Sequence, residues 1–98
     1  MKVRWTLAAT QDRAEIVEYI AADNPLAALK IDALFSEAAA RLGDFPRLGS
    51  PGKIPGTREL IPHDNYRLVY EIDDAELTVW VMALVHTARQ WPPAKRDL

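Results

Sequence analysis

The first part of this 98-residue chain alternates apolar and polar positions with the period of a strand and then with that of a helix. Residues 3–7 alternate strictly, which predicts a short half-buried strand. Residues 8–22 carry apolar side chains at helical spacing, and Thr6 can cap the helix that they form. Asn24 and Pro25 then suit the N-cap and the first position of a second helix, so a pair of helices is expected directly after the strand.

The second helix is predicted by a stripe of apolar residues that recurs every three or four positions. The stripe consists of Ala27 or Ala28, Ile31, Leu34, Phe35, Ala38 and Leu42. Gly43 is expected to end this helix, and the short break before it predicts an antiparallel hairpin with the first helix. Residues 43–56 contain three prolines and four glycines, which is typical of a loop.

Three strands are predicted in the second half of the chain, at residues 57–62, 66–72 and 77–85, with turns at 62–65 and 73–76. The last run is apolar almost throughout, as in a central strand. The order strand, helix, helix and three strands predicts one α+β domain (residues 1–98) with two layers, in which a helical hairpin covers an antiparallel meander. The first strand is expected to enter the sheet beside the last. Three large aromatic residues are expected in the core: Trp5, Phe35 and Trp80.

The composition is that of a globular protein, with 49% hydrophobic and 27% charged residues. Cysteine is absent, which excludes a disulfide framework and a cysteine-based zinc site. The two histidines and the scattered carboxylates lack the spacing of metal ligands, so neither a metal nor another cofactor is expected. The sequence shows no secretion signal and no apolar run of membrane-spanning length, which predicts a soluble cytoplasmic protein without a membrane partner.

Charge is unevenly distributed along the chain. The net charge of −2 and the pI of about 5.6 weigh against a dedicated nucleic-acid binder. Residues 7–44 hold three basic and seven acidic side chains, whereas residues 45–70 hold four basic and two acidic ones and residues 89–98 hold three and one. A local positive site is therefore expected where the middle stretch meets the tail.

Several segments of the chain carry recognisable motifs. The segment Tyr-Arg-Leu-Val-Tyr at residues 66–70 resembles the signature strand of the RelE/ParE superfamily of bacterial toxins. The loop at residues 45–51 and the ending at residues 85–91 resemble ParE-like members, and the helix at residues 12–20 also fits. This resemblance implies a RelE/ParE-like fold and the role of toxin in a type II toxin–antitoxin pair. A cognate antitoxin protein would bind it in a hetero-oligomer.

The branches of this superfamily differ in mechanism. RelE-like members are ribosome-dependent mRNA endonucleases, and ParE-like members act on DNA gyrase without that chemistry. The sequence departs from the nuclease pattern because Gly56 stands where some members have a glutamate base, only Lys53 represents a lysine cluster, and Thr87 replaces a tyrosine. A ParE-like gyrase inhibitor is therefore favoured. An mRNA interferase that acts on ribosome-bound mRNA and a non-toxic member that only binds its antitoxin are the alternatives.

Arg67 is the first candidate site residue. In the strand predicted at residues 66–72, Arg67, Val69 and Glu71 share the face opposite the helices. The resemblance implies that Arg67 stabilises the transition-state phosphate if the chain is a nuclease, a role that suits a guanidinium group. The other reading is an ion pair with Glu71 or Glu59.

His86 is the second candidate, and it ends the last predicted strand. The resemblance implies that its imidazole protonates the leaving oxygen in a nuclease. The alternative is a capping side chain beside Trp80, Met82 and Leu84, which share its strand parity.

Further residues are candidates for contacts with a target or with phosphate groups: Lys53, Arg58, His63, Arg89 and Trp91. For the basic residues and for the turn histidine, plain solvation is the alternative. Trp91 either packs back on the sheet or marks a partner-binding patch.

Overall fold

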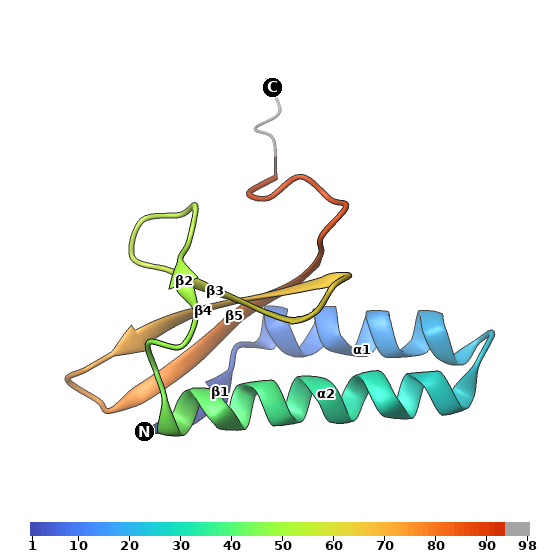
Figure 1. The fold of residues 1–98 in the computed structure, drawn as a ribbon, viewed down its shortest axis with the longest axis horizontal. Helices are drawn as coiled ribbons and strands as arrows, with labels where there is room; N and C mark the ends of the chain where they lie inside the picture. The colour runs from blue at the N-terminus through green and yellow to red at the C-terminus, as the bar shows by residue number, and fades with distance from the viewer. Residues whose placement is uncertain (94–98) are drawn as a thin grey trace.

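The computed structural model describes residues 1–93 and contains two helices and five strands (Figure 1). The elements are, in order, β1 (Lys2–Trp5), α1 (Leu7–Ala21), α2 (Pro25–Asp44), β2 (Ser50–Pro51), β3 (Arg58–His63), β4 (Tyr66–Asp73) and β5 (Thr78–His86). The predicted α+β order is confirmed, and the predicted loop between helix and sheet gains a two-residue strand, β2. Lys95 and Arg96, which belong to the expected positive site, lie outside the described residues.

The strands form one sheet in the order β1-β5-β4-β3-β2. β1 lies beside β5, as expected, and runs parallel to it, whereas the other pairs are antiparallel. Figure 1 shows both helices on one side of this sheet, with the loop around β2 and the segment that follows β5 up to residue 93 on the other. We call the side away from the helices the outer face. Neither helix in residues 1–93 combines the length and the hydropathy that a membrane span needs.

Both helices begin where their capping residues predict. The Thr6 hydroxyl accepts a hydrogen bond from Ala9 N at 3.1 Å, and the Asn24 side chain accepts one from Ala27 N at 3.1 Å. Gly43 does not end α2, because the helix continues through Asp44. A Cβ at Gly43 would lie 2.9 Å from the carbonyl oxygen of Met1, so the glycine serves the close approach of the N-terminus.

The core fills the space between the helices and the inner face of the sheet. Its largest fully buried side chains, apart from Val69 of the outer face, are Phe35, Leu42, Leu68, Tyr70, Val79 and Val81. Trp5 is partly buried against this cluster, as expected. The expectation that Trp80 belongs to the core is wrong. Val79 and Val81 take the inner face, so Trp80 between them points to the outer face.

A β-bulge in β5 decides on which face the end of this strand presents its side chains. Val69 pairs with Ala83 and Tyr70 with Val81, so Met82 is the extra residue. After the bulge the alternation is reversed, and buried Leu84 packs in the core together with Val81. The parity that grouped His86 with Trp80 and Met82 is therefore wrong, although the grouping with Leu84 is right.

Arg13 joins α1, α2 and β1. Its Nε lies 2.7 Å from Asp32 Oδ1, its Nη2 donates to Asp32 O and to Ser36 Oγ, and its guanidinium lies 4.9 Å from the centre of a Trp5 ring. We expect Arg13→Ala to lower the free energy of unfolding by about 2 kcal/mol, since it removes charge-assisted hydrogen bonds and a cation–π contact. Urea unfolding followed by circular dichroism measures this loss. Lys30→Ala, at an exposed position of α2, is the control and should be neutral.

Candidate functional site

Arg67 lies on the outer face, as predicted, and is paired with Glu59. Arg67 Nε lies 3.0 Å from Glu59 Oε1, and the two side chains are only 15% and 13% exposed. The N–H direction misses hydrogen-bond geometry, so the contact is an ion pair and Nε has no hydrogen-bond acceptor within the described residues. The sequence left Glu59 and Glu71 as possible partners of Arg67, and the structure shows the ion pair with Glu59.

Glu59 also holds the loop that connects β2 to β3. Its second oxygen, Oε2, accepts a hydrogen bond from Lys53 N at 3.0 Å. The same loop is closed by the hydrogen bond from Gly52 N to Thr57 O, and Gly56 takes a positive φ of 85° that favours glycine. The loop around Lys53 is thus fixed to the sheet through its main chain, whereas the Lys53 side chain is exposed.

Arg58 is occupied by main-chain carbonyls of the loop before β2. Its guanidinium donates to Gly49 O at 2.6 and 3.0 Å and to Arg47 O at 3.2 Å. The buried Tyr70 hydroxyl donates to Pro46 O and accepts from Gly49 N, which fixes the same segment from the other side. These hydrogen bonds give Arg58 a structural role in holding the loop, and its role in target binding stays a prediction.

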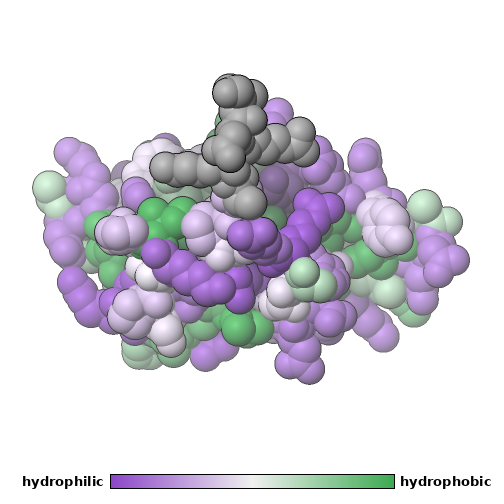
Figure 2. All heavy atoms as spheres, turned by 90° about the horizontal axis from the view of Figure 1, so that it is seen from above, coloured by the Kyte–Doolittle hydropathy of each residue, from purple (hydrophilic) through white to green (hydrophobic). Residues whose placement is uncertain are grey.

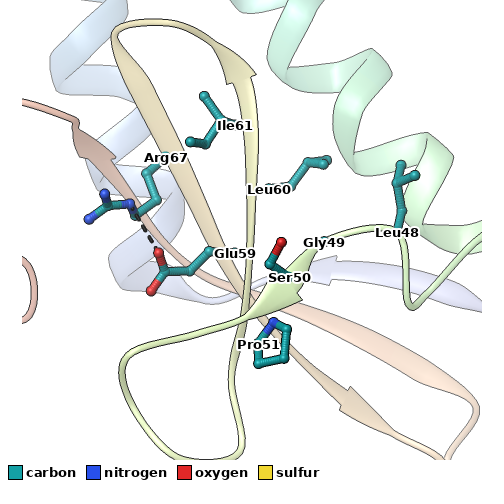
Figure 3. A pocket seen from close by; sticks show the side chains of 8 residues that line it. All are labelled: Leu48, Gly49, Ser50, Pro51, Glu59, Leu60, Ile61 and Arg67. Carbon is teal, nitrogen blue, oxygen red and sulfur yellow. Dashed lines mark ion pairs between the residues drawn. The ribbon is translucent and has the colours of Figure 1, made fainter.

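A pocket of about 310 Å³ opens on the outer face between this loop and β3. The residues that line it are Leu48, Gly49, Ser50, Pro51, Glu59, Leu60, Ile61 and Arg67 (Figure 3). Leu48 is 40% and Ile61 57% exposed, so apolar side chains stand at its rim and the ion pair lies at its side. Figure 2 shows mainly hydrophilic side chains on the visible part of this side of the molecule, with apolar ones scattered among them.

His86 and Arg89 lie elsewhere, in a second pocket of about 430 Å³ between α1 and the end of the sheet. The other residues that line it are Asp12, Glu15, Ile16, Tyr19, Tyr66 and Leu84. The Nδ1 atom of His86 accepts a hydrogen bond from Ala88 N, which supports the capping alternative for this side chain. His63 also lies near this end, with its ring centre 5.9 Å from that of Tyr66.

The structure therefore separates the two candidate catalytic residues. Tyr66 pairs with His86 and Arg67 with Val85, so the candidates are one residue out of register on adjacent strands. Arg67 faces outward, and His86 faces the helix side together with Tyr66. Trp91 is half-buried, and its indole Nε1 is buried without a hydrogen-bond acceptor in the described part of the chain, so the ring packs against the rest of the protein.

Comparison with known sequences identifies the family. The sequence model of the family described as ParE toxin of the type II toxin–antitoxin system, parDE, matches residues 3–91. This chain belongs to the ParE toxin family. The "Putative toxin Y4kP" of Sinorhizobium fredii is 38% identical to this family member over 93 residues, which cover 93% of each chain.

Solved structures show that this ParE family member has the RelE/ParE fold. The chromosomal ParDE system of P. aeruginosa gives a TM-score of 0.76 at 20% identity, covering 88% of this chain and 95% of the other. The RelBE2 toxin–antitoxin complex of Mycobacterium tuberculosis gives a TM-score of 0.65 at 30% identity, covering 87% and 95%. The predicted superfamily is confirmed, and both branches appear among its structural relatives.

The sequence did not single out three residues that shape the outer pocket. Glu59 was considered only as a partner of Arg67, and its link to the loop was missed. Leu48 and Ile61 lie in the predicted loop and in a predicted strand, and nothing in the sequence marked them as residues of a pocket. The strand alternation of β3 carries a signal for Glu59, since it places this carboxylate opposite Val69 and on the same face as Arg67.

Proposed function

We propose that this chain is the toxin of a type II toxin–antitoxin module that binds DNA gyrase and inhibits it without covalent chemistry, while a cognate antitoxin neutralises it in a hetero-oligomer. The separation of Arg67 and His86 on opposite faces of the sheet carries the proposal. Gyrase as the target is what the ParE-like resemblance implies, and membership of the ParE toxin family supports this choice. This function places the protein in the cytoplasm, where gyrase works.

The separation matters because RNA cleavage needs several groups at one phosphate. Attack by a 2′-hydroxyl requires a base, an acid and stabilisation of the developing charge, all within hydrogen-bond reach of the reacting atoms. Arg67 and His86 would have to supply the last two, and the sheet lies between them. In addition, Glu59 neutralises Arg67 at 3.0 Å, which weakens its attraction for a phosphate group.

One observation favours the alternative of a ribosome-dependent mRNA endonuclease. In the second pocket, His86 and Arg89 lie with the carboxylates of Asp12 and Glu15, so an acid, a cation and a base share one cavity. However, two carboxylates face one arginine there, and this balance repels the phosphates of RNA. The gyrase proposal therefore remains the better supported one.

The antitoxin half of the proposal is supported by exposed apolar surface and by the relatives. Tyr19, Leu26 and Leu29 of the helical hairpin are 84%, 62% and 69% exposed, which is unfavourable unless a partner covers them. The Mycobacterium tuberculosis relative was solved as a toxin–antitoxin complex. An antitoxin tail that folds along the hairpin would bury such side chains.

A gyrase assay with the purified chain tests the target. We expect inhibition of DNA supercoiling and accumulation of cleaved DNA, and both effects should disappear when the cognate antitoxin is added. Programmed ribosomes with mRNA are the parallel assay. Cleavage of the mRNA with no effect on gyrase would replace this proposal by the endonuclease. No effect in either assay and no growth arrest would indicate a member that only binds its antitoxin.

His86→Asn separates the two mechanisms within one protein. The amide oxygen of the substituted side chain can accept the hydrogen bond from Ala88 N, but an amide cannot act as an acid near neutral pH. We expect growth arrest on induction to stay at the wild-type level, because an inhibitor needs no proton donor. If His86→Asn instead reduced the growth-arrest activity by roughly 100-fold or more, which is the usual contribution of a general acid, the result would support the nuclease.

A further inference from the structure

We propose that Glu59 is a positioning residue of the surface through which this chain engages its target, and that the outer pocket beside Leu48, Ile61 and Arg67 is the centre of this surface. This inference rests on the proposed function of a protein inhibitor. The partner is a protein segment with an apolar side chain next to a hydrogen-bond acceptor.

Glu59 is suited to this role because each of its carboxylate oxygens holds a different element. Oε1 lies 3.0 Å from Arg67 Nε on β4, and Oε2 accepts from Lys53 N in the loop at 3.0 Å. Figure 3 shows Glu59 between Arg67 and the loop that leaves β2. One side chain thereby connects Arg67, which lines the pocket, with the loop that follows the pocket residue Pro51.

The loop between β2 and β3 is closed by hydrogen bonds within itself. Gly52 N donates to Thr57 O at 2.8 Å, and the Thr57 hydroxyl donates to Ile54 O at 2.6 Å. Gly52 is required because a Cβ there would collide with the Thr57 hydroxyl oxygen. A loop that is already in its binding conformation avoids the entropy cost of ordering on association, so loss of this order should weaken binding.

The pocket offers the chemistry of a protein contact. Apolar Leu48 and Ile61 are 40% and 57% exposed at its rim. Arg67 forms an ion pair with Glu59 but makes no hydrogen bond within the described residues, so its guanidinium N–H groups can donate to a carbonyl or carboxylate. Arginine is enriched at the energetic centres of protein interfaces, and apolar neighbours exclude water from its contacts.

Glu59 itself is not a contact residue. It is 13% exposed, and both its oxygens are engaged within the chain. Its charge is nevertheless needed, because a glutamine has one acceptor where Arg67 and Lys53 present two N–H donors. In Glu59→Gln one of the two contacts is therefore replaced by a repulsion between donors.

The test compares three purified full-length variants in the gyrase supercoiling assay. For Glu59→Gln we expect inhibition at least about 10-fold weaker than wild type and amide hydrogen exchange of Lys53 at least about 10-fold faster, as loss of one ordering contact implies. Glu71→Gln is the matched control, since it makes the same chemical change at an exposed position of β4 on the outer face but outside the pocket. Arg13→Ala controls for stability, since it weakens the fold far from the loop.

Both controls should inhibit gyrase like wild type at a temperature where every variant is folded. Wild-type inhibition by Glu59→Gln, or an equal loss in Arg13→Ala, would overturn the positioning role while the proposed function stands. A wild-type chain that does not inhibit gyrase at all refutes the proposed function instead. The same variants are then compared for growth arrest on induction. Equal arrest by Glu59→Gln and wild type, or no arrest by wild type, overturns the inference.

Discussion

Phe35→Ala is expected to remove about 3–5 kcal/mol from the free energy of unfolding, the usual cost of deleting a large buried aromatic side chain. Phe35 is fully buried on α2, and its ring is perpendicular to the Tyr66 ring at a centroid distance of 5.4 Å. Small domains are stable by only about 5–15 kcal/mol, so this loss is a large share of the total stability. Urea unfolding at equilibrium measures the change.

Leu29→Ala on the same helix is the control for Phe35→Ala. Leu29 is 69% exposed, and its truncation should change the free energy of unfolding by less than about 0.5 kcal/mol. Equal effects of the two substitutions would show that α2 does not bury the face on which Phe35 lies. This small effect of Leu29→Ala is expected only when the antitoxin is absent, because we propose that the antitoxin covers this part of the hairpin.

Arg67→Ala is expected to lower the free energy of unfolding by roughly 2–3 kcal/mol, since it leaves the carboxylate of Glu59 poorly hydrated and unpaired. The expected loss is below that for a fully buried pair, because the two side chains remain 15% and 13% exposed. The double variant Arg67→Met with Glu59→Gln should recover most of this stability. It carries no charge at the site, and the amide oxygen introduced by the Glu59→Gln change can still accept from Lys53 N.

The double variant also separates folding from function. We expect it to unfold in urea at nearly the wild-type midpoint and still to be a poor inhibitor of gyrase, because the guanidinium that faces the target is gone. Thermal unfolding and the supercoiling assay on the same preparation measure both quantities. Full inhibition by this stable variant would mean that Arg67 serves only the fold.

Local patterns in the sequence were sufficient to predict the layers of this protein. The caps at Thr6 and Asn24 and the apolar stripe through Phe35 specify two helices, because hydrogen bonds and burial on one helix depend on residues three and four positions apart. Alternation in the second half of the chain specifies β4, so the outward direction of Arg67 was predicted correctly. The motifs at residues 12–20, 45–51, 66–70 and 85–91 together indicated the superfamily.

Which side chains of these helices and strands contact each other is decided only by the tertiary structure. The bulge at Met82 reverses the alternation of β5 and places His86 on the face opposite Arg67, and an apolar run gives no local signal for such an inserted residue. Glu59 can contact both Arg67 and Lys53 only because β4 and the loop between β2 and β3 lie close together in the folded chain. Contacts between distant segments follow from register and loop closure, and these are set by packing of the whole chain rather than by local periodicity.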